Sequence, residues 1–197
     1  MIAIIDYGAG NLKSVQHALE YLRTESVITD SPETIKKVDR LILPGDGSFG
    51  YMMSSLKKKK LIEPIKDFLA KSIRGGKPFL GICLGFQGLF EESEESPGIK
   101  GLSIFKGKVI KFRKGKVPQI GWNRIVPKQN GIFREDYMYF VNSFAVVPQD
   151  PSIIAAETDY HGNFASAVKF NDITAMQFHP EKSGNAGIEL LRRWLSS

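Results

Sequence analysis

The stretch Phe79-Leu-Gly-Ile-Cys-Leu-Gly-Phe-Gln87 begins with an apolar run and continues into a cysteine placed between two glycines. The apolar run predicts a buried strand, and the glycines permit a sharp turn from that strand into a helix. In hydrolases such a turn presents a nucleophile in an unusual backbone conformation. We therefore expect Cys83 to be a nucleophile, with a buried structural thiol as the alternative.

The residues before this turn alternate between apolar stretches and helical patterns. Apolar residues at helical spacing predict one helix from Leu12 to Leu22 and another over residues 62–73, and Ser31 followed by Pro32 is typical of a helix start. A further helix is expected over residues 86–94. The rhythm predicts parallel strands, covered by helices on both faces, over residues 2–5, 26–29, 41–43 and 79–82.

The second half of the chain is richer in strand patterns. Strands are predicted over residues 109–112, 138–147, 153–158, 164–170 and 173–178, followed by a helix over about residues 185–195. No low-complexity linker divides the halves. We expect an α/β fold with an open, mostly parallel central sheet, flanking helices and additional antiparallel strands, in a single domain over residues 1–197.

The composition excludes several classes of protein. Of the 197 residues, 42% are hydrophobic and 24% are charged, which is typical of a globular domain and argues against disorder. No apolar run is long enough for a membrane span, and residues 1–6 predict a strand rather than a signal peptide. The single cysteine excludes an internal disulfide and favours a cytoplasmic, reducing location. One cysteine and three histidines make a zinc site unconvincing.

The net charge of +6 includes basic clusters within residues 57–60 and 106–116. Such clusters can bind nucleic acid, but the sequence contains no nucleic-acid motif, so we do not expect that partner. A solvated face, a site for a phosphorylated metabolite or contact with an acidic partner are the alternatives.

A second motif, His179-Pro-Glu181, follows the apolar run over residues 173–176. Catalytic groups in open α/β sheets gather beyond the carboxyl ends of strands. His179 is expected to take the thiol proton of Cys83, and Glu181 to orient the imidazole through its other nitrogen. By itself the motif is an ordinary polar turn, but with the cysteine turn it becomes much more specific.

The segment Gly45-Asp-Gly-Ser-Phe-Gly50 matches a dinucleotide-binding pattern, but it begins after Pro44 and lacks the acidic residue at the following strand end. We expect instead a loop of free backbone amides beside Cys83. This loop would supply a second donor to an oxyanion, in addition to the N–H of Leu84.

Together these motifs resemble the class I (triad) glutamine amidotransferases, and among them the glutaminase subunits of imidazole glycerol phosphate synthase. The resemblance extends over the whole chain and is carried by residues 81–87, Asp6-Tyr-Gly-Ala-Gly-Asn11, Leu89-Phe-Glu-Glu-Ser-Glu-Glu95, Gly121-Trp-Asn123, Tyr139-Phe-Val141 and His179-Pro-Glu-Lys-Ser183.

The resemblance implies that the chain hydrolyses L-glutamine to glutamate and ammonia through a cysteine thioester. The ammonia would pass to a (β/α)8-barrel cyclase subunit, the partner in a heterodimer, for histidine biosynthesis. No metal or organic cofactor is implied. The alternatives are a paralogue that supplies another synthetase, such as a sugar-modifying amidotransferase, a different cysteine hydrolase, and a non-catalytic subunit.

The same resemblance assigns roles to individual positions beyond the triad of Cys83, His179 and Glu181. The substrate and oxyanion region would comprise Gly45, Asp46, Leu84, Gln87, Glu95, Asn142, Ser143 and Phe144. The cyclase would contact Asn11, Trp122, Tyr139 and Lys182.

Four positions depart from the family pattern. Phe86 and Gly88 stand where Met and Leu are usual, which a packing exchange would explain, and Asn142 replaces a common His near the glutamine pocket. Asp46 replaces a small apolar residue, and its charge would oppose an oxyanion. We therefore expect the Asp46 side chain to point away from Cys83, while its N–H acts as a conditional donor.

Overall fold

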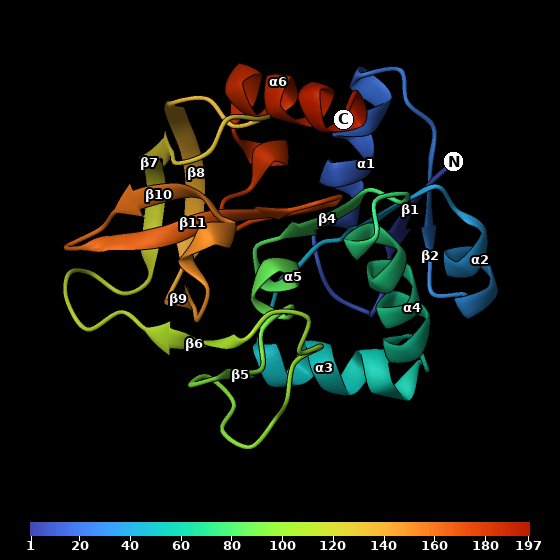
Figure 1. Cartoon of the computed structure of the whole chain (residues 1–197), viewed down its shortest axis with the longest axis horizontal. Coiled ribbons are helices and arrows are strands. Elements are labelled where there is room, and N and C mark those ends of the chain that lie inside the picture. The colour runs from blue at the N-terminus through green and yellow to red at the C-terminus, as the bar shows by residue number, and fades with distance from the viewer.

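Five parallel strands form one side of the sheet in the computed structural model, which describes residues 1–197 (Figure 1). Four come from the first half of the chain: β1 (Ile2–Ile5), β2 (Ser26–Thr29), β3 (Arg40–Leu43) and β4 (Phe79–Ile82). The fifth, β12 (Ile173–Met176), pairs with β4 and completes the order β2-β1-β3-β4-β12. The predicted parallel sheet is therefore confirmed.

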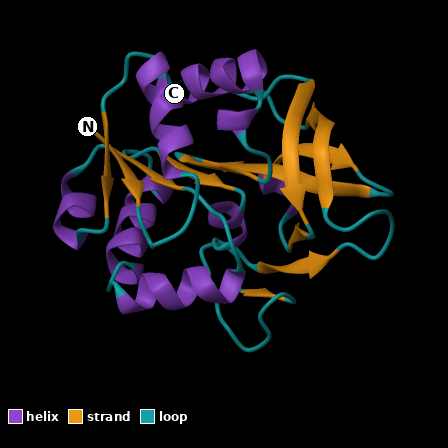
Figure 2. Cartoon of the chain, turned by 180° about the vertical axis from the view of Figure 1, so that it is seen from behind, coloured by secondary structure: helices purple, strands orange, loops and turns teal.

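Antiparallel strands extend the sheet beyond β12 at one end of the molecule (Figure 2). In spatial order they are β11 (Asn163–Phe170), β10 (Ile154–Asp159), β7 (Gln119–Pro127) and β8 (Asp136–Asn142). A side branch leads from β11 to β9 (Phe144–Pro148), then to β6 (Gly107–Lys111) and β5 (Glu92–Ser93). These strands confirm the expected antiparallel additions.

Helices cover both faces of the parallel strands, as Figure 1 shows. On one face lie α1 (Leu12–Tyr21) and α6 (Gly184–Leu195). On the other lie α2 (Pro32–Lys37), α3 (Phe49–Lys58) and α4 (Ile62–Ile73). Two short 3-10 turns, Pro151–Ile153 and Pro180–Lys182, and the single-turn α5 (Leu84–Gln87) complete the fold.

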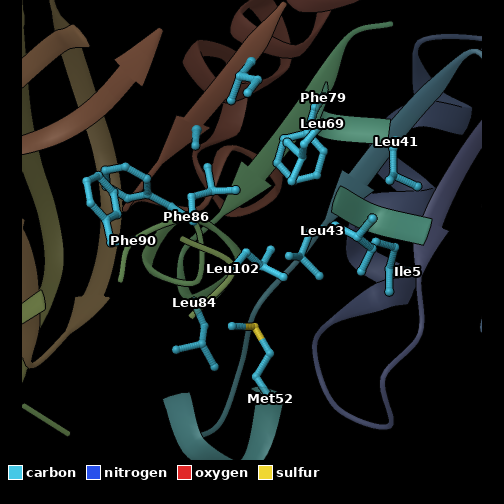
Figure 3. Close-up of a cluster of buried hydrophobic side chains, with 14 of the residues drawn as sticks. Ile5, Leu41, Leu43, Met52, Leu69, Phe79, Leu84, Phe86, Phe90 and Leu102 are labelled. Carbon is cyan, nitrogen blue, oxygen red and sulfur yellow. The ribbon is translucent and has the colours of Figure 1, made fainter. Parts of the chain in front are cut away.

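Two apolar layers hold the central strands because successive side chains of a strand point to opposite faces. Ile4 packs with α1 and α6, whereas Ile5 belongs to the layer shared with the other helices. Figure 3 shows this second layer, which contains Leu43 from β3, Met52 from α3 and Leu69 from α4. Packing on both faces therefore fixes the positions of the strand ends.

The predicted helix over residues 86–94 is wrong, because α5 ends at Gln87. The carbonyl groups beyond it bond to a distant segment: the N–H of Leu102 donates to Gly88 and that of Gly101 to Glu91. Residues 92–93 then join the sheet as β5. Long-range pairing has replaced the local helical hydrogen bonds.

The single strand predicted over residues 138–147 is divided into β8 and β9 at Ser143. The chain changes neighbours there, since β8 pairs with β7 whereas β9 pairs with β6 and β11. Neither α3 nor β7 was predicted. In β7 the exposed face carries Ile120 and Trp122, so the usual alternation of buried apolar and exposed polar residues is lost.

No helix in the structure combines the length and the apolar character that a membrane crossing requires.

Candidate active site

The carboxyl ends of four central strands bring the candidate residues to one edge of the sheet. Tyr7 follows β1, Gly45 follows β3, Cys83 follows β4 and His179 follows β12. Because these strands are parallel, all four segments lie at the same edge. The fold thus collects residues that are far apart in the sequence.

Cys83 occupies a sharp turn with a φ of 53° and a ψ of −109°, a conformation that costs energy for a residue with a side chain. Its N–H donates to the carbonyl oxygen of Met176 at 2.8 Å, which ties the turn to β12. A Cβ atom on Gly85 would lie 1.9 Å from the carbonyl oxygen of Leu43, so only glycine fits there. Neighbouring strands therefore hold the turn in its strained form.

The helix after Cys83 has a single turn, which is shorter than expected. Its dipole consequently contributes less to stabilising a thiolate than a full helix would. The thiol depends more on specific neighbours than on the helix. Two of these neighbours, the imidazole of His179 and the side-chain amide of Gln177, come from the segment after β12.

His179 and Glu181 form a buried pair, with 2.7 Å between Nδ1 of the imidazole and Oε1 of the carboxylate. Only 6% of the His179 side chain and 2% of the Glu181 side chain are exposed. The backbone of His179 is held at both polar groups, since its N–H donates to Tyr139 and its carbonyl accepts from the Ser183 hydroxyl. The ring is therefore oriented with Nε2 left for Cys83.

The environment favours the protonated imidazole of His179. Burial by itself lowers its pKa, but hydrogen bonding and the charges of Cys83 and Glu181 outweigh burial and raise the pKa from 6.5 to about 10. Nε2 makes no aligned hydrogen bond at rest, and Cys83 is the ionisable group beside it. An imidazolium next to a cysteine stabilises the thiolate, which is the reactive form.

The loop between β3 and α3 packs directly on the nucleophile turn, because a Cβ atom on Gly45 would lie 2.3 Å from Cβ of Leu84. The expectation of free amides in this loop is wrong. The N–H of Asp46 donates to the Tyr7 hydroxyl, which in turn donates to the carbonyl oxygen of Asp46, both at 2.9 Å. The N–H of Gly47 donates to Oδ1 of Asp46 at 2.8 Å. The N–H groups of Asp46 and Gly47 therefore have partners in the protein before any ligand arrives.

Tyr7 is the buried support of this loop, with 1% of its surface exposed. Burial raises the pKa of its phenol well above the usual range, and the nearby charges of Cys83 and Asp46 add to that effect. The hydroxyl therefore keeps its proton and can act as both donor and acceptor. The Asp46 carboxylate is exposed and accepts a hydrogen bond within its own loop.

A cavity of about 250 Å³ opens over Cys83. All of the predicted substrate residues except Gly45 line this cavity. The cavity is lined by Asp46, Gly47, Cys83, Leu84, Gln87, Glu95, Pro118, Val141, Asn142, Ser143, Phe144, His179 and Lys182. Gly47, Pro118 and Val141 were not predicted, and Lys182 was predicted only as a partner contact.

Three polar side chains of the cavity already have partners in the protein. Nε2 of Gln87 donates to Oε1 of Gln177 at 2.9 Å and to the carbonyl oxygen of Phe144 at 3.3 Å. Nδ2 of Asn142 donates to the same carbonyl at 3.0 Å, and its Oδ1 is buried without a partner. Oε2 of Glu95 accepts from the first amide of α3 at 2.7 Å. The atoms left for a ligand are mainly acceptors.

The departures at Phe86 and Gly88 each have their own packing contact. A Cβ atom on Gly88 would lie 2.5 Å from Cε of Met52, so the Met52 side chain fills the space that a larger residue would occupy. Phe86 is fully buried and packs edge-to-face on Phe90, with ring centroids 5.7 Å apart. The observed contacts fit the expected exchange of packing.

The predicted partner residues lie outside the cavity, except for Lys182. Trp122 and Tyr139 are paired across β7 and β8, with ring centroids 6.2 Å apart. Trp122 is 56% exposed, and Ile120 on the same face is 61% exposed, although large apolar side chains are usually covered. Asn11 precedes α1.

Two further residues that support the site were not predicted, Gln177 and Tyr7. Gln177 is a buried polar residue directly after β12, and Tyr7 is a buried residue with a polar hydroxyl two positions after β1. That position was the available signal, because a polar residue continuing an apolar strand needs a buried partner.

A profile described as "Glutamine amidotransferase class-I" matches residues 3–196. Two solved structures share the fold. One is a "glutamine amidotransferase" with a TM-score of 0.79 and 17% identity, and the match covers 100% of this chain and 98% of the other. The second is "PurLQS from Thermotoga maritima", with a TM-score of 0.74 and 19% identity, and the match covers 99% of this chain and 97% of the other. The chain belongs to the class I glutamine amidotransferase family.

Curated relatives narrow this assignment. A protein of Pyrococcus furiosus is 49% identical over 98% of this chain and 97% of its own length, and one of Methanothermobacter thermautotrophicus is 42% identical over 99% and 98%. Both are named "Imidazole glycerol phosphate synthase subunit HisH". Within its family, the chain therefore groups with these HisH subunits. A paralogue with a different ammonia acceptor is not favoured.

Proposed function

We propose that the chain is a glutaminase subunit that hydrolyses L-glutamine through a thioester on Cys83 and delivers ammonia to a (β/α)8-barrel cyclase subunit for histidine biosynthesis. One observation carries the chemistry: Cys83 stands on a strained turn, inside a cavity, beside the buried pair of His179 and Glu181. Membership in the family supports glutamine as the substrate.

In the first step, the Cys83 thiolate attacks the side-chain carbonyl carbon of glutamine and forms a tetrahedral intermediate. His179, protonated at Nε2, gives its proton to the departing amide nitrogen, so ammonia leaves and a thioester remains. Glu181 holds the ring through Nδ1 during this transfer. In the second step, water gives a proton to His179 and attacks the thioester, which releases glutamate and restores the thiolate.

The intermediate needs hydrogen-bond donors for its negative oxygen. The N–H of Leu84 is the donor on the nucleophile turn, and the N–H of Asp46 is a second, conditional donor. The second donor requires a change, since the Tyr7 hydroxyl accepts from it in this structure. The loop at Asp46 would therefore become fully effective only after it leaves Tyr7.

The amino-acid end of the substrate would be bound by Gln87 and Glu95. Both N–H groups of the Gln87 amide are directed to protein acceptors, which leaves its oxygen for a donor. Oε2 of Glu95 accepts a hydrogen bond from the backbone N–H of Phe49, and its Oε1 remains available to the substrate. These acceptors suit the α-ammonium group of glutamine.

The partner would cover the face of β7 and β8 that carries Trp122 and Tyr139, together with Asn11 and Lys182. Val141 continues this face into the cavity wall, since it pairs with Ile120 in the sheet. The partner would thus shield ammonia released at Cys83 from bulk water, which would otherwise protonate it. A reducing cytoplasm suits the proposal because the nucleophile must remain a thiol.

The test is a glutaminase assay on the purified chain, alone and with the cyclase subunit. We expect glutamate release that increases when the cyclase is present, and its loss in Cys83→Ala. Trp122→Ala should weaken cyclase binding, whereas Tyr21→Ala, which removes an aromatic side chain that is 72% exposed on α1, should not.

Each alternative has its own outcome. Glutamate release that survives Cys83→Ala would reject the proposed nucleophile. No activity at saturating cyclase would favour a non-catalytic subunit, and stimulation by a different synthetase would favour another acceptor.

A further inference from the structure

Gln177 is a fully buried polar residue directly after β12, and its side-chain amide bridges Cys83 and Gln87. Its Nε2 lies 3.5 Å from Sγ of Cys83, and its Oε1 accepts from Nε2 of Gln87 at 2.9 Å. The backbone N–H of Gln177 donates to the carbonyl oxygen of Ser166, which anchors the residue in the sheet.

The network decides which end of the Gln177 amide faces the sulfur. Gln87 shares its N–H groups between Oε1 of Gln177 and the carbonyl oxygen of Phe144, both of which are acceptors. The oxygen of Gln177 must therefore point to Gln87, and its nitrogen must point to Cys83. The reverse orientation would place two N–H donors face to face and two acceptors together.

We propose that Gln177 is a hydrogen-bond donor that stabilises the Cys83 thiolate, an inference that rests on the proposed function of Cys83. A hydrogen bond to a charged acceptor is stronger than one to a neutral acceptor, and the low dielectric of a buried site increases the difference. The amide therefore stabilises the thiolate more than the thiol. With a single-turn helix behind Cys83, this donor supplements the imidazolium of His179.

The same network connects the nucleophile to the substrate pocket. Gln87 lines the cavity, and its position determines the orientation of the Gln177 amide. The wall that holds the amino-acid end of glutamine thus also keeps a donor directed at the sulfur.

Two substitutions separate this role from simple packing. Gln177→Met keeps the length of the side chain but removes the donor. Gln177→Glu keeps an acceptor for Gln87 and places an anionic oxygen where the donor was. We expect iodoacetamide alkylation of Cys83 to shift to higher pH in both variants and most in Gln177→Glu. Glutaminase kcat should fall about tenfold in Gln177→Met, as expected for loss of one hydrogen bond to a charged group.

Thr174→Val is the matched control. Thr174 lies on β12, the strand that Gln177 follows, is fully buried, and has a hydroxyl without a hydrogen-bond partner, so removing this hydroxyl should change neither the pH dependence of alkylation nor kcat. Thermal unfolding of all three variants shows whether they remain folded.

An unchanged pH dependence of Cys83 alkylation in folded Gln177→Met and Gln177→Glu would overturn the inference, even if both variants lose activity. It would leave the proposed glutaminase function intact, because that function is tested by the wild-type chain and Cys83→Ala.

Discussion

The turn at Cys83 and the loop at Asp46 lie against each other, yet they are held in different ways. The turn is held by backbone contacts. Its glycines pack on neighbouring carbonyl groups, and the N–H of Cys83 donates a hydrogen bond to Met176 of β12. The loop is exposed at Asp46 and is held by one phenol hydroxyl and by its own side chain. The difference indicates that the turn at Cys83 is permanently formed, whereas the loop that carries the proposed second oxyanion donor is adjustable.

The first test of this difference is Gly85→Ala, which should have the largest effect on stability and activity. The new Cβ would lie 1.9 Å from the carbonyl oxygen of Leu43, so β3 and the turn must separate. We expect the free energy of unfolding to fall by on the order of 4 kcal/mol, with loss of glutaminase activity. Chemical denaturation measures this change.

Gly76→Ala is the control for that experiment, because nothing lies within 4 Å of the added Cβ and the backbone conformation is ordinary. Its unfolding free energy should change by less than about 0.5 kcal/mol. Equal losses of unfolding free energy in the two variants would show that close backbone packing at Gly85 does not hold the turn.

Glu181→Gln tests the electrostatics of the permanent part of the site. In the folded protein the imidazolium of His179 persists until the pH approaches its raised pKa of about 10, so His179 carries a positive charge beside Cys83 throughout the neutral range. Removing the carboxylate lowers the pKa of His179 and reduces that charge. We expect kcat to fall roughly a hundredfold, with Cys83 alkylation shifted to higher pH.

Glu189→Gln, at an exposed position on α6, is the matched control and should leave both measurements unchanged. If the alkylation profile of Glu181→Gln matched that of the wild type, the proposed pairing of Cys83 and His179 would be wrong.

Tyr7→Phe tests the adjustable part. It removes the two hydrogen bonds to the backbone of Asp46 and leaves the aromatic packing in place. We expect glutaminase activity without the cyclase to rise several-fold, because the N–H of Asp46 becomes available to the oxyanion. The unfolding free energy should fall by about 1 kcal/mol.

The control for Tyr7→Phe is Tyr51→Phe, which removes a hydroxyl that bonds to Gly8 and not to the loop. It should not change the basal rate. A basal rate in Tyr7→Phe that stays equal or falls would contradict a restraining role for Tyr7.

Asp46→Asn should have the smallest effect. The carboxylate is exposed and bonds to the N–H of Gly47, a contact that the amide oxygen of asparagine can replace. We expect the basal rate to stay within about twofold, because solvent screens the charge. Greatly faster basal hydrolysis would show that the charge acts on the site.

Much of this organisation could be predicted from local patterns. The apolar run before Cys83, the flanking glycines and the His179 motif predicted strand ends at one edge of a parallel sheet, and they lie there. The helix expected over residues 86–94 failed because its carbonyl groups bond to residues 101–105, a contact that no local pattern reveals. The strand break at Ser143 likewise depends on which strands become neighbours.

The sequence by itself determined the parallel strands, the cysteine turn and the residues that could form a triad, because these depend on side-chain periodicity and on the backbone freedom of glycine. Only the tertiary structure decided that the loop amides are occupied and that Gln177 faces the sulfur. The reason is that a buried polar group bonds to whichever partner the fold places beside it, and such partners are distant in the chain.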